Sequence, residues 1–177
     1  MADQNLLGSW FIQTLEVGTF SYSTAALTNS AISSSAAIES SKLLNRLQCV
    51  YSQADGANVA STAGEGVVVY VCDKANGATI KKVSALCQDV GTGGSPAHNI
   101  AIEVKRWDES GSTLATVLSA AVNITESETD YETVNGTLTV TDMDLGDALV
   151  VQVTVTGSGG TNPQGLGVQV EVEEAGS

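Results

Sequence analysis

Three aspartates in the C-terminal third of the chain have the spacing of metal ligands. Asp142, Asp144 and Asp147 stand in the pattern Asp-x-Asp-x-Gly-Asp, in which carboxylates at alternate positions can converge on one Ca²⁺ ion. A complete calcium loop also needs a bidentate Glu further along, and none stands at the right distance. We therefore predict a solvated acidic turn, with these aspartates as a weak metal candidate, and we expect no cofactor.

The other residues that could support catalysis lack partners at useful spacing. The sole histidine, His98, has no Cys within a few residues and no local sign of a Ser/His/Asp triad. The run Glu126, Glu128, Asp130 and Glu132 contains the residue type needed for glycoside hydrolysis, but that chemistry depends on a spatial separation that a sequence does not fix. We interpret this run as an exposed connection and predict that the protein is not an enzyme.

The three cysteines, Cys49, Cys72 and Cys87, are an odd number at wide spacing, without a Cys-x-x-Cys pair. A disulfide framework needs an even count, and a zinc site needs closer or more numerous ligands. We predict that all three are small buried thiols in strands.

The charge balance excludes two classes of partner. The 177 residues carry 20 Asp and Glu against 7 Lys and Arg, a formal charge of −13. Affinity for nucleic acid comes mainly from Lys and Arg that displace counterions, so we predict no nucleic-acid binding. We also predict no membrane binding, because an acidic surface repels anionic lipid and no apolar run reaches the length of a membrane span. The N-terminus lacks the features of a signal peptide, which favours synthesis in a cytoplasm.

Two runs near the C-terminus, 148–156 and 166–173, place a large apolar residue at every second position. This period of two is typical of antiparallel strands with one buried face and one wet face. The predicted inward residues are Leu149, Val151, Val153, Val155, Leu166, Val168, Val170 and Val172. We therefore expect two sheets closed over one apolar core.

Further strand patterns give about eight strands after residue 42, the count of a jelly roll rather than of an immunoglobulin-like sandwich. The predicted fold is all-β: one antiparallel, eight-stranded, jelly-roll-like β-sandwich over residues 43–177. The run 66–72 is apolar on both faces, as in a covered central strand or a strand that meets a partner. Residues 131–141 are predicted to pair around an Asn135-Gly136 turn. The other predicted strands are 43–52, 78–87, 98–107, 113–119 and 122–125.

Residues 1–42 are predicted to form an extended N-terminal arm. Its first half concentrates large apolar side chains, and its second half is a Ser/Ala-rich tether. Aromatic residues in an irregular terminal segment fit either a docking anchor or a flap over the protein's own core, and both remain open. The candidate partner-binding residues are Leu6, Leu7, Trp10, Phe11, Ile12, Phe20 and Tyr22.

Several blocks together resemble the jelly-roll domains of tailed-bacteriophage virion proteins. The blocks are Ala78–Ala85, Asn99–Lys105, Asn135–Val140, Leu145–Val155 and Pro163–Glu173. The resemblance covers residues of about 43–174 and is mostly a rhythm of strands and turns. It implies a non-enzymatic structural role on the particle, such as a capsid decoration (cement) protein or a fibre or spike module.

The arm narrows that choice. Jelly-roll shells that contact their genome usually carry an Arg/Lys-rich arm, whereas this arm has only Lys42 and, just beyond it, Arg46. We therefore expect a homo-oligomeric decoration protein, a trimer by preference, on the outer capsid surface, with the major capsid protein as its partner. The alternatives are a tail fibre or spike module that contacts the host surface, with Trp107 its one exposed-aromatic candidate, and a carbohydrate-binding β-sandwich module.

Overall fold

The structure of the protein is a computed structural model, which describes residues 45–62 and 64–174. These residues form ten strands and no helix, so none of them belongs to a helix that could cross a membrane. Two of the strands, β7 and β8, have only two residues each. The strands are β1 (Asn45–Ser52), β2 (Val67–Val71), β3 (Ala78–Asp89), β4 (Asn99–Asp108), β5 (Thr113–Thr116), β6 (Val122–Thr125), β7 (Val134–Asn135), β8 (Asp142–Met143), β9 (Ala148–Thr156) and β10 (Gln164–Glu174).

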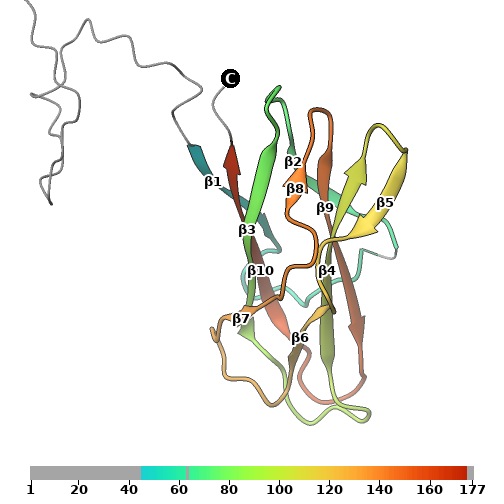
Figure 1. Cartoon of the computed structure of the whole chain (residues 1–177). Coiled ribbons are helices and arrows are strands. Elements are labelled where there is room, and N and C mark those ends of the chain that lie inside the picture. The colour runs from blue at the N-terminus through green and yellow to red at the C-terminus, as the bar shows by residue number, and fades with distance from the viewer. Residues whose placement is uncertain (1–44, 63, 175–177) are drawn as a thin grey trace, which may run out of the picture. The chain divides into compact units, whose positions relative to one another are not determined.

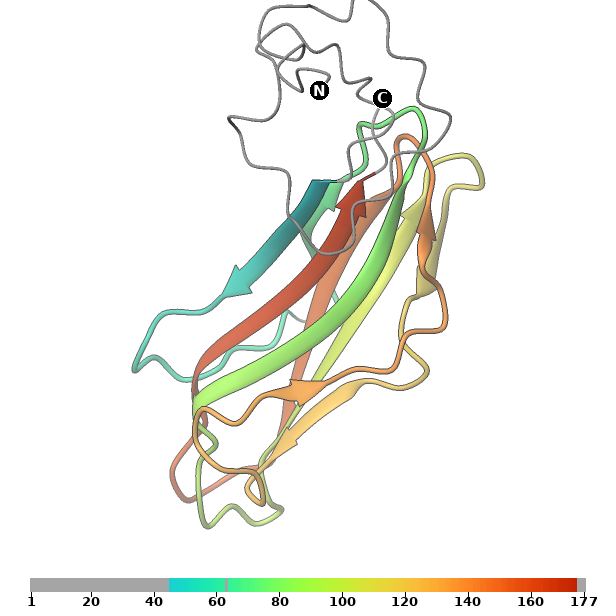
Figure 2. The same cartoon turned by 60° about the vertical axis from the view of Figure 1, so that its left-hand side comes forward.

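The strands form two antiparallel sheets that lie face to face (Figures 1 and 2). The first sheet has the order β1-β10-β3-β7, with β8 also paired to β3. The second sheet has the order β2-β9-β4-β5, with β6 also paired to β4. The pairs are nested along the chain: β1 with β10, β2 with β9, β3 with β7 and β8, and β4 with β5 and β6.

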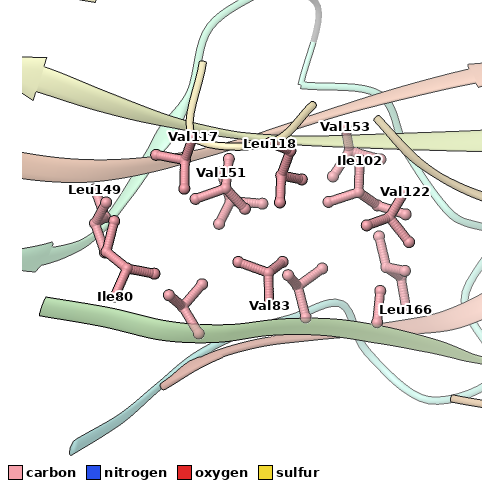
Figure 3. Close-up of a cluster of buried hydrophobic side chains, with 14 of the residues drawn as sticks. Ile80, Val83, Ile102, Val117, Leu118, Val122, Leu149, Val151, Val153 and Leu166 are labelled. Atoms are coloured by element: carbon pink, nitrogen blue, oxygen red, sulfur yellow. The ribbon is translucent and has the colours of Figure 1, made fainter. Parts of the chain in front are cut away.

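The space between the sheets is filled by aliphatic side chains (Figure 3). Ile80 and Val83 of the first sheet point toward Val151, Val153 and Ile102 of the second, and each of the five is at most 1% exposed. The alternation read from the sequence is confirmed on β9 and β10, where seven of the eight predicted inward residues are buried and Val155 is partly buried against the same core. The all-β, two-sheet prediction is therefore confirmed.

Two local predictions differ from the structure. Residues 131–141 do not make a hairpin, because only Val134 and Asn135 of that stretch form a strand and they pair with β3. Gly136 is needed for close packing instead of a turn: a Cβ there would lie 2.7 Å from Leu118 Cδ2. The run 66–72 contains β2, which pairs with β9 alone among the described residues and is therefore an edge strand and not a central one; the alternative that it meets a partner stays a prediction.

The predicted arm, with its boundary at residue 42 and its seven candidate partner-binding side chains from Leu6 to Tyr22, lies outside the described residues. Those predictions therefore remain predictions.

Candidate protein-binding interface

The aspartate-rich turn is held by hydrogen bonds from the protein itself. Asp147 is 2% exposed, and its carboxylate accepts the backbone N–H groups of Glu109 (3.1 Å) and Asp144 (2.9 Å). Arg106 places its guanidinium 3.7 Å from the same carboxylate and donates to the backbone oxygen of Asp142 at 2.6 Å. Asp142 and Asp144 are themselves exposed. Within residues 45–62 and 64–174, no group of three or more His, Cys, Asp or Glu side chains is arranged to hold a metal ion.

His98 is buried at the end of the sandwich where β4 begins. Its Nε2 donates to the backbone oxygen of Gly159 at 2.7 Å, because a carbonyl can only accept. Its Nδ1 is buried and has no partner among the described atoms. The neighbouring carboxylate, Glu126, accepts the backbone N–H groups of His98 (2.8 Å) and Gly94 (3.0 Å), and these bonds, the first of them above all, lower the pKa of Glu126. These bonds tie together the loops before β4, after β6 and after β9.

The other carboxylates of this run, in Glu128, Asp130 and Glu132, also accept hydrogen bonds from the protein itself. Glu128 accepts the backbone and side-chain donors of Thr125, each at 2.6 Å, which lowers the pKa of the Glu128 carboxyl. Glu132 accepts the N–H of Thr129 at 2.9 Å, and Asp130 accepts a backbone N–H of the loop after β3 at 3.1 Å. These side chains close turns, so they do not form a paired acid and base.

The cysteines are free thiols. Cys72 and Cys87 are buried, whereas Cys49 is partly exposed, and Cys72 follows β2 instead of lying in a strand. Burial raises the pKa of the Cys87 thiol, which lies 2.9 Å from the backbone oxygen of Gln164. Burial likewise raises the pKa of Cys49. Thiols that resist ionisation are poor nucleophiles, which fits a packing role for Cys49 and Cys87.

An apolar row crosses the outer face of the second sheet from edge to edge. Directly opposed residues of antiparallel strands project from the same face. Val71 of β2 pairs with Ala148 of β9, Ala148 pairs with Trp107 of β4, and Trp107 pairs with Leu114 of β5. These four residues are the apolar row. Three of them are large and exposed: Val71 is 54% exposed, Trp107 40% and Leu114 45%.

A second rank of side chains extends this surface. Val68, which is 56% exposed, pairs with Val150, and Val150 pairs with Lys105. The ammonium of Lys105 lies 3.1 Å from the carboxylate of Glu103 and 2.6 Å from the amide oxygen of Gln152. The one charge in this rank is therefore neutralised within the sheet, and the apolar row contains no ionisable side chain.

An exposed edge strand with apolar residues is a surface that proteins normally cover. Within the described part of the chain, β2 has a neighbour on one side only, and its outer-face residues Val68 and Val71 are more than half exposed. Soluble proteins blunt such edges with charges, prolines or bulges. β2 has one register irregularity near Val68 but no charge and no proline. Contiguous exposed apolar residues are typical of protein contact sites.

The sequence indicated one part of this surface only through the alternative that the run 66–72 meets a partner, and that alternative stays a prediction. It did not predict the row, because the row joins residues 71, 107, 114 and 148 through strand register. The opposite outer face, on the first sheet, is polar: Arg46 and Lys81 there form ion pairs with Glu171 and Glu173. The two faces of the sandwich therefore suit different kinds of contact.

No protein-family model matches this sequence, and no curated protein matches it. Among solved structures, the chain is similar to one titled Desmodium yellow mottle tymovirus. The alignment covers 92% of this chain and 96% of that chain, with 12% sequence identity and a TM-score of 0.29. A TM-score this low does not establish a shared fold, so what the chain does has to be argued from its own residues.

Proposed function

We propose that this protein is a non-enzymatic structural protein of a virion, and specifically a capsid decoration (cement) protein on the outside of a phage head. The observation that carries the proposal is the nested pairing of the strands, from β1 with β10 inward to β4 with β5 and β6. A long antiparallel ribbon rolled up in this way is a jelly roll, an architecture common among viral capsid proteins and lectins. The nested pairings involve all ten strands, and β7 and β8, the nested partners of β3, have two residues each.

The charge distribution supports a place on the outer surface. Of the seven Lys and Arg in the chain, six fall in the described residues, and five of these lie within 4.0 Å of a carboxylate. An inner shell protein needs unpaired cations to contact the phosphates of the genome. A chain of formal charge −13 whose described cations are mostly paired is repelled by packaged nucleic acid, so the outside of the shell suits it better.

Two parts of the chain would make two different contacts, one with other copies of the chain and one with the capsid. We assign the apolar row to contact between copies of this chain, as a homo-oligomer with a trimer preferred. A surface without ionisable residues allows strongly acidic bodies to meet without placing carboxylates opposite one another. We assign residues 1–42 to the major capsid protein, with Leu6, Leu7, Trp10, Phe11, Ile12, Phe20 and Tyr22 as anchors. Segments of this composition gain affinity by ordering on a site that the assembled shell provides.

The test is co-sedimentation with undecorated capsids. Full-length protein and a variant lacking residues 1–22 are each mixed with purified capsids, and the particles are re-isolated. We expect many full-length copies per particle and almost none of the truncated chain. Circular dichroism of the truncated chain should retain the β-sheet spectrum, since the sandwich begins at Asn45. Equal binding of both proteins would contradict the role of the arm, and binding of neither would contradict the decoration role.

A second candidate function is favoured by one observation on the first sheet. The notable feature there is a depression lined by polar side chains on the outer face. This depression supports a carbohydrate-binding function. The protein would then be either a carbohydrate-binding β-sandwich module or a fibre or spike module that contacts the host surface.

A further inference from the structure

The depression on the first sheet is formed by three strands that lie side by side, seen as the teal, red and green strands in Figure 2. Its volume is about 210 Å³. In one rank, Gln48 of β1 is opposite Glu171 of β10, and Glu171 is opposite Lys82 of β3. In the next rank, Gln169 of β10 is opposite Ser84 of β3. These five residues line the depression.

The hydrogen-bonding groups of this depression are largely unused. Within residues 45–62 and 64–174, the side chains of Gln48, Lys82, Ser84 and Gln169 make no hydrogen bond or ion pair. Glu171 has one partner, the Arg46 guanidinium at 3.3 Å. Donors and acceptors that converge on one hollow without satisfying one another are the pattern of a ligand site, because a bound molecule can then replace water at each of them.

Lys82 stands apart from the other described cations. Arg46, Lys74, Lys81, Lys105 and Arg106 all lie within 4.0 Å of a carboxylate, and Lys82 does not. In a chain with 20 acidic residues, an unpaired lysine at the edge of a polar depression is free to donate to a ligand oxygen.

The floor and one wall of the depression add shape and an apolar contact. Ser84 is only 6% exposed, so its small side chain forms the floor between longer neighbours. Val50 of β1 pairs with Gln169 and therefore projects from the same face, where it is 63% exposed. The site thus offers polar tips on one side and an aliphatic ledge on the other.

We infer that this depression is a binding site for one unit of a neutral sugar. A sugar ring carries neighbouring hydroxyls that can donate to the Glu171 carboxylate and accept from Lys82 and the two Gln amides, and its C–H face can lie on Val50. The volume is below the roughly 300–1,000 Å³ of sites for drug-sized ligands, so it matches a single ring. Strands about 4.8 Å apart place the polar tips at the spacing of hydroxyls across one ring.

This inference does not depend on the decoration role, because it concerns the sheet face opposite the apolar row. A sugar site on an outward-projecting body would add a contact with glycans around the particle. The site has no aromatic stacking platform, so each unit should bind weakly, with a dissociation constant on the order of 1 mM. Several copies held together would then bind a polysaccharide far more tightly than one copy.

The test is an NMR titration of the full-length protein with glucose, galactose and N-acetylglucosamine, each to about 100 mM, a hundred times the expected dissociation constant. We expect at least one sugar to shift the side-chain amide signals of Gln48 and Gln169 in a saturable way. The double variant Lys82→Met, Gln169→Leu should weaken binding at least tenfold. The matched control is Lys105→Met, Gln152→Leu, which removes a mutually hydrogen-bonded Lys and Gln from the outer face of the other sheet and should leave binding unchanged.

Two results would overturn the inference. The first is the absence of saturable shifts with all three sugars in a protein whose spectrum shows a folded sandwich. The second is that the Gln48 and Gln169 signals do not shift with any sugar but do shift when residues 1–42 are deleted. That result would mean that the protein's own N-terminal segment occupies the depression. Neither result bears on capsid binding, which is measured separately by co-sedimentation.

Discussion

Replacing Trp107 by Thr should weaken the association between copies of this chain by about 30-fold. Trp107 lies in the middle of the apolar row, between Ala148 and Leu114. Large aromatic side chains bury roughly 150–250 Å² each when fully covered, and Trp107 is 40% exposed. A partner that covers it would therefore remove about 60–100 Å² more from water.

At about 25 cal/mol per Å², this area corresponds to about 1.5–2.5 kcal/mol of binding free energy. A loss of about 2 kcal/mol raises a dissociation constant about 30-fold. Threonine keeps a β-branched side chain on the strand, so the sandwich itself should remain folded. Sedimentation equilibrium across a range of protein concentrations measures the dissociation constant of the oligomer directly.

The matched control is Tyr131→Asn, which removes an exposed aromatic residue outside the row. Tyr131 is 62% exposed and has a φ of 61°, a conformation that Asn tolerates well. We expect the control to associate like the unmodified protein. If Trp107→Thr associates as tightly as the control, or if the unmodified chain is monomeric at every concentration, the apolar row is not the interface between copies.

Three further predictions concern folding stability and are measured by urea denaturation. Tyr70→Phe should lower the unfolding free energy by about 1.5–3 kcal/mol, because the Tyr70 hydroxyl donates at 2.8 Å to the buried carboxylate of Glu174; an unchanged midpoint would show that this bond contributes nothing. Asp147→Ala should lower the unfolding free energy by about 3 kcal/mol, since it leaves two backbone N–H groups of a buried turn unpaired. A decrease below about 1 kcal/mol would mean that water replaces the carboxylate. The hydrogen bonds from Thr125 lower the pKa of Glu128 in the folded state, so the Glu128 carboxylate stabilises the fold above its unfolded pKa of about 4.3, and this stabilisation is lost as the pH falls through the lower folded pKa. In the variant Glu128→Gln, the unfolding free energy should therefore depend less on pH below about pH 5. An unchanged pH dependence would contradict this.

The core was predictable from sequence because period-two alternation is a local signal. Val168, Val170 and Val172 alternate with Gln and Glu, and a strand with one buried face must place such residues on the same side. The roles of two glutamates were also readable. Thr125-x-x-Glu128 and Thr129-x-x-Glu132 follow the Thr-x-x-Glu pattern in which the glutamate accepts the threonine N–H. We interpreted them only as an exposed connection.

The role of Gly136 and the polar depression could not be predicted without the three-dimensional structure. An Asn-Gly pair is a strong turn signal, yet Gly136 is used where the chain passes close to Leu118 and Val122. A local pattern does not reveal which of these two uses of glycine applies, because the second depends on residues brought close by the core. The polar depression is likewise non-local, since its residues come from β1, β3 and β10 and are aligned only by register.

The apolar row is uncharged whereas the chain as a whole is strongly acidic, so the salt dependence of association tests whether copies meet through this row. Each copy carries a formal charge of −13, so bringing copies together costs electrostatic repulsion at any interface that lacks compensating cations. Salt shortens the screening length from about 30 Å at 0.01 M to about 10 Å at 0.1 M, whereas burial of Val71, Trp107 and Leu114 is not weakened by screening. Association should therefore become stronger between 0.01 M and 0.3 M NaCl, as measured by sedimentation equilibrium. An interface built on ion pairs would weaken over the same range, and that result would place the contact on the charged face near Arg46 and Lys81 instead of on the apolar row.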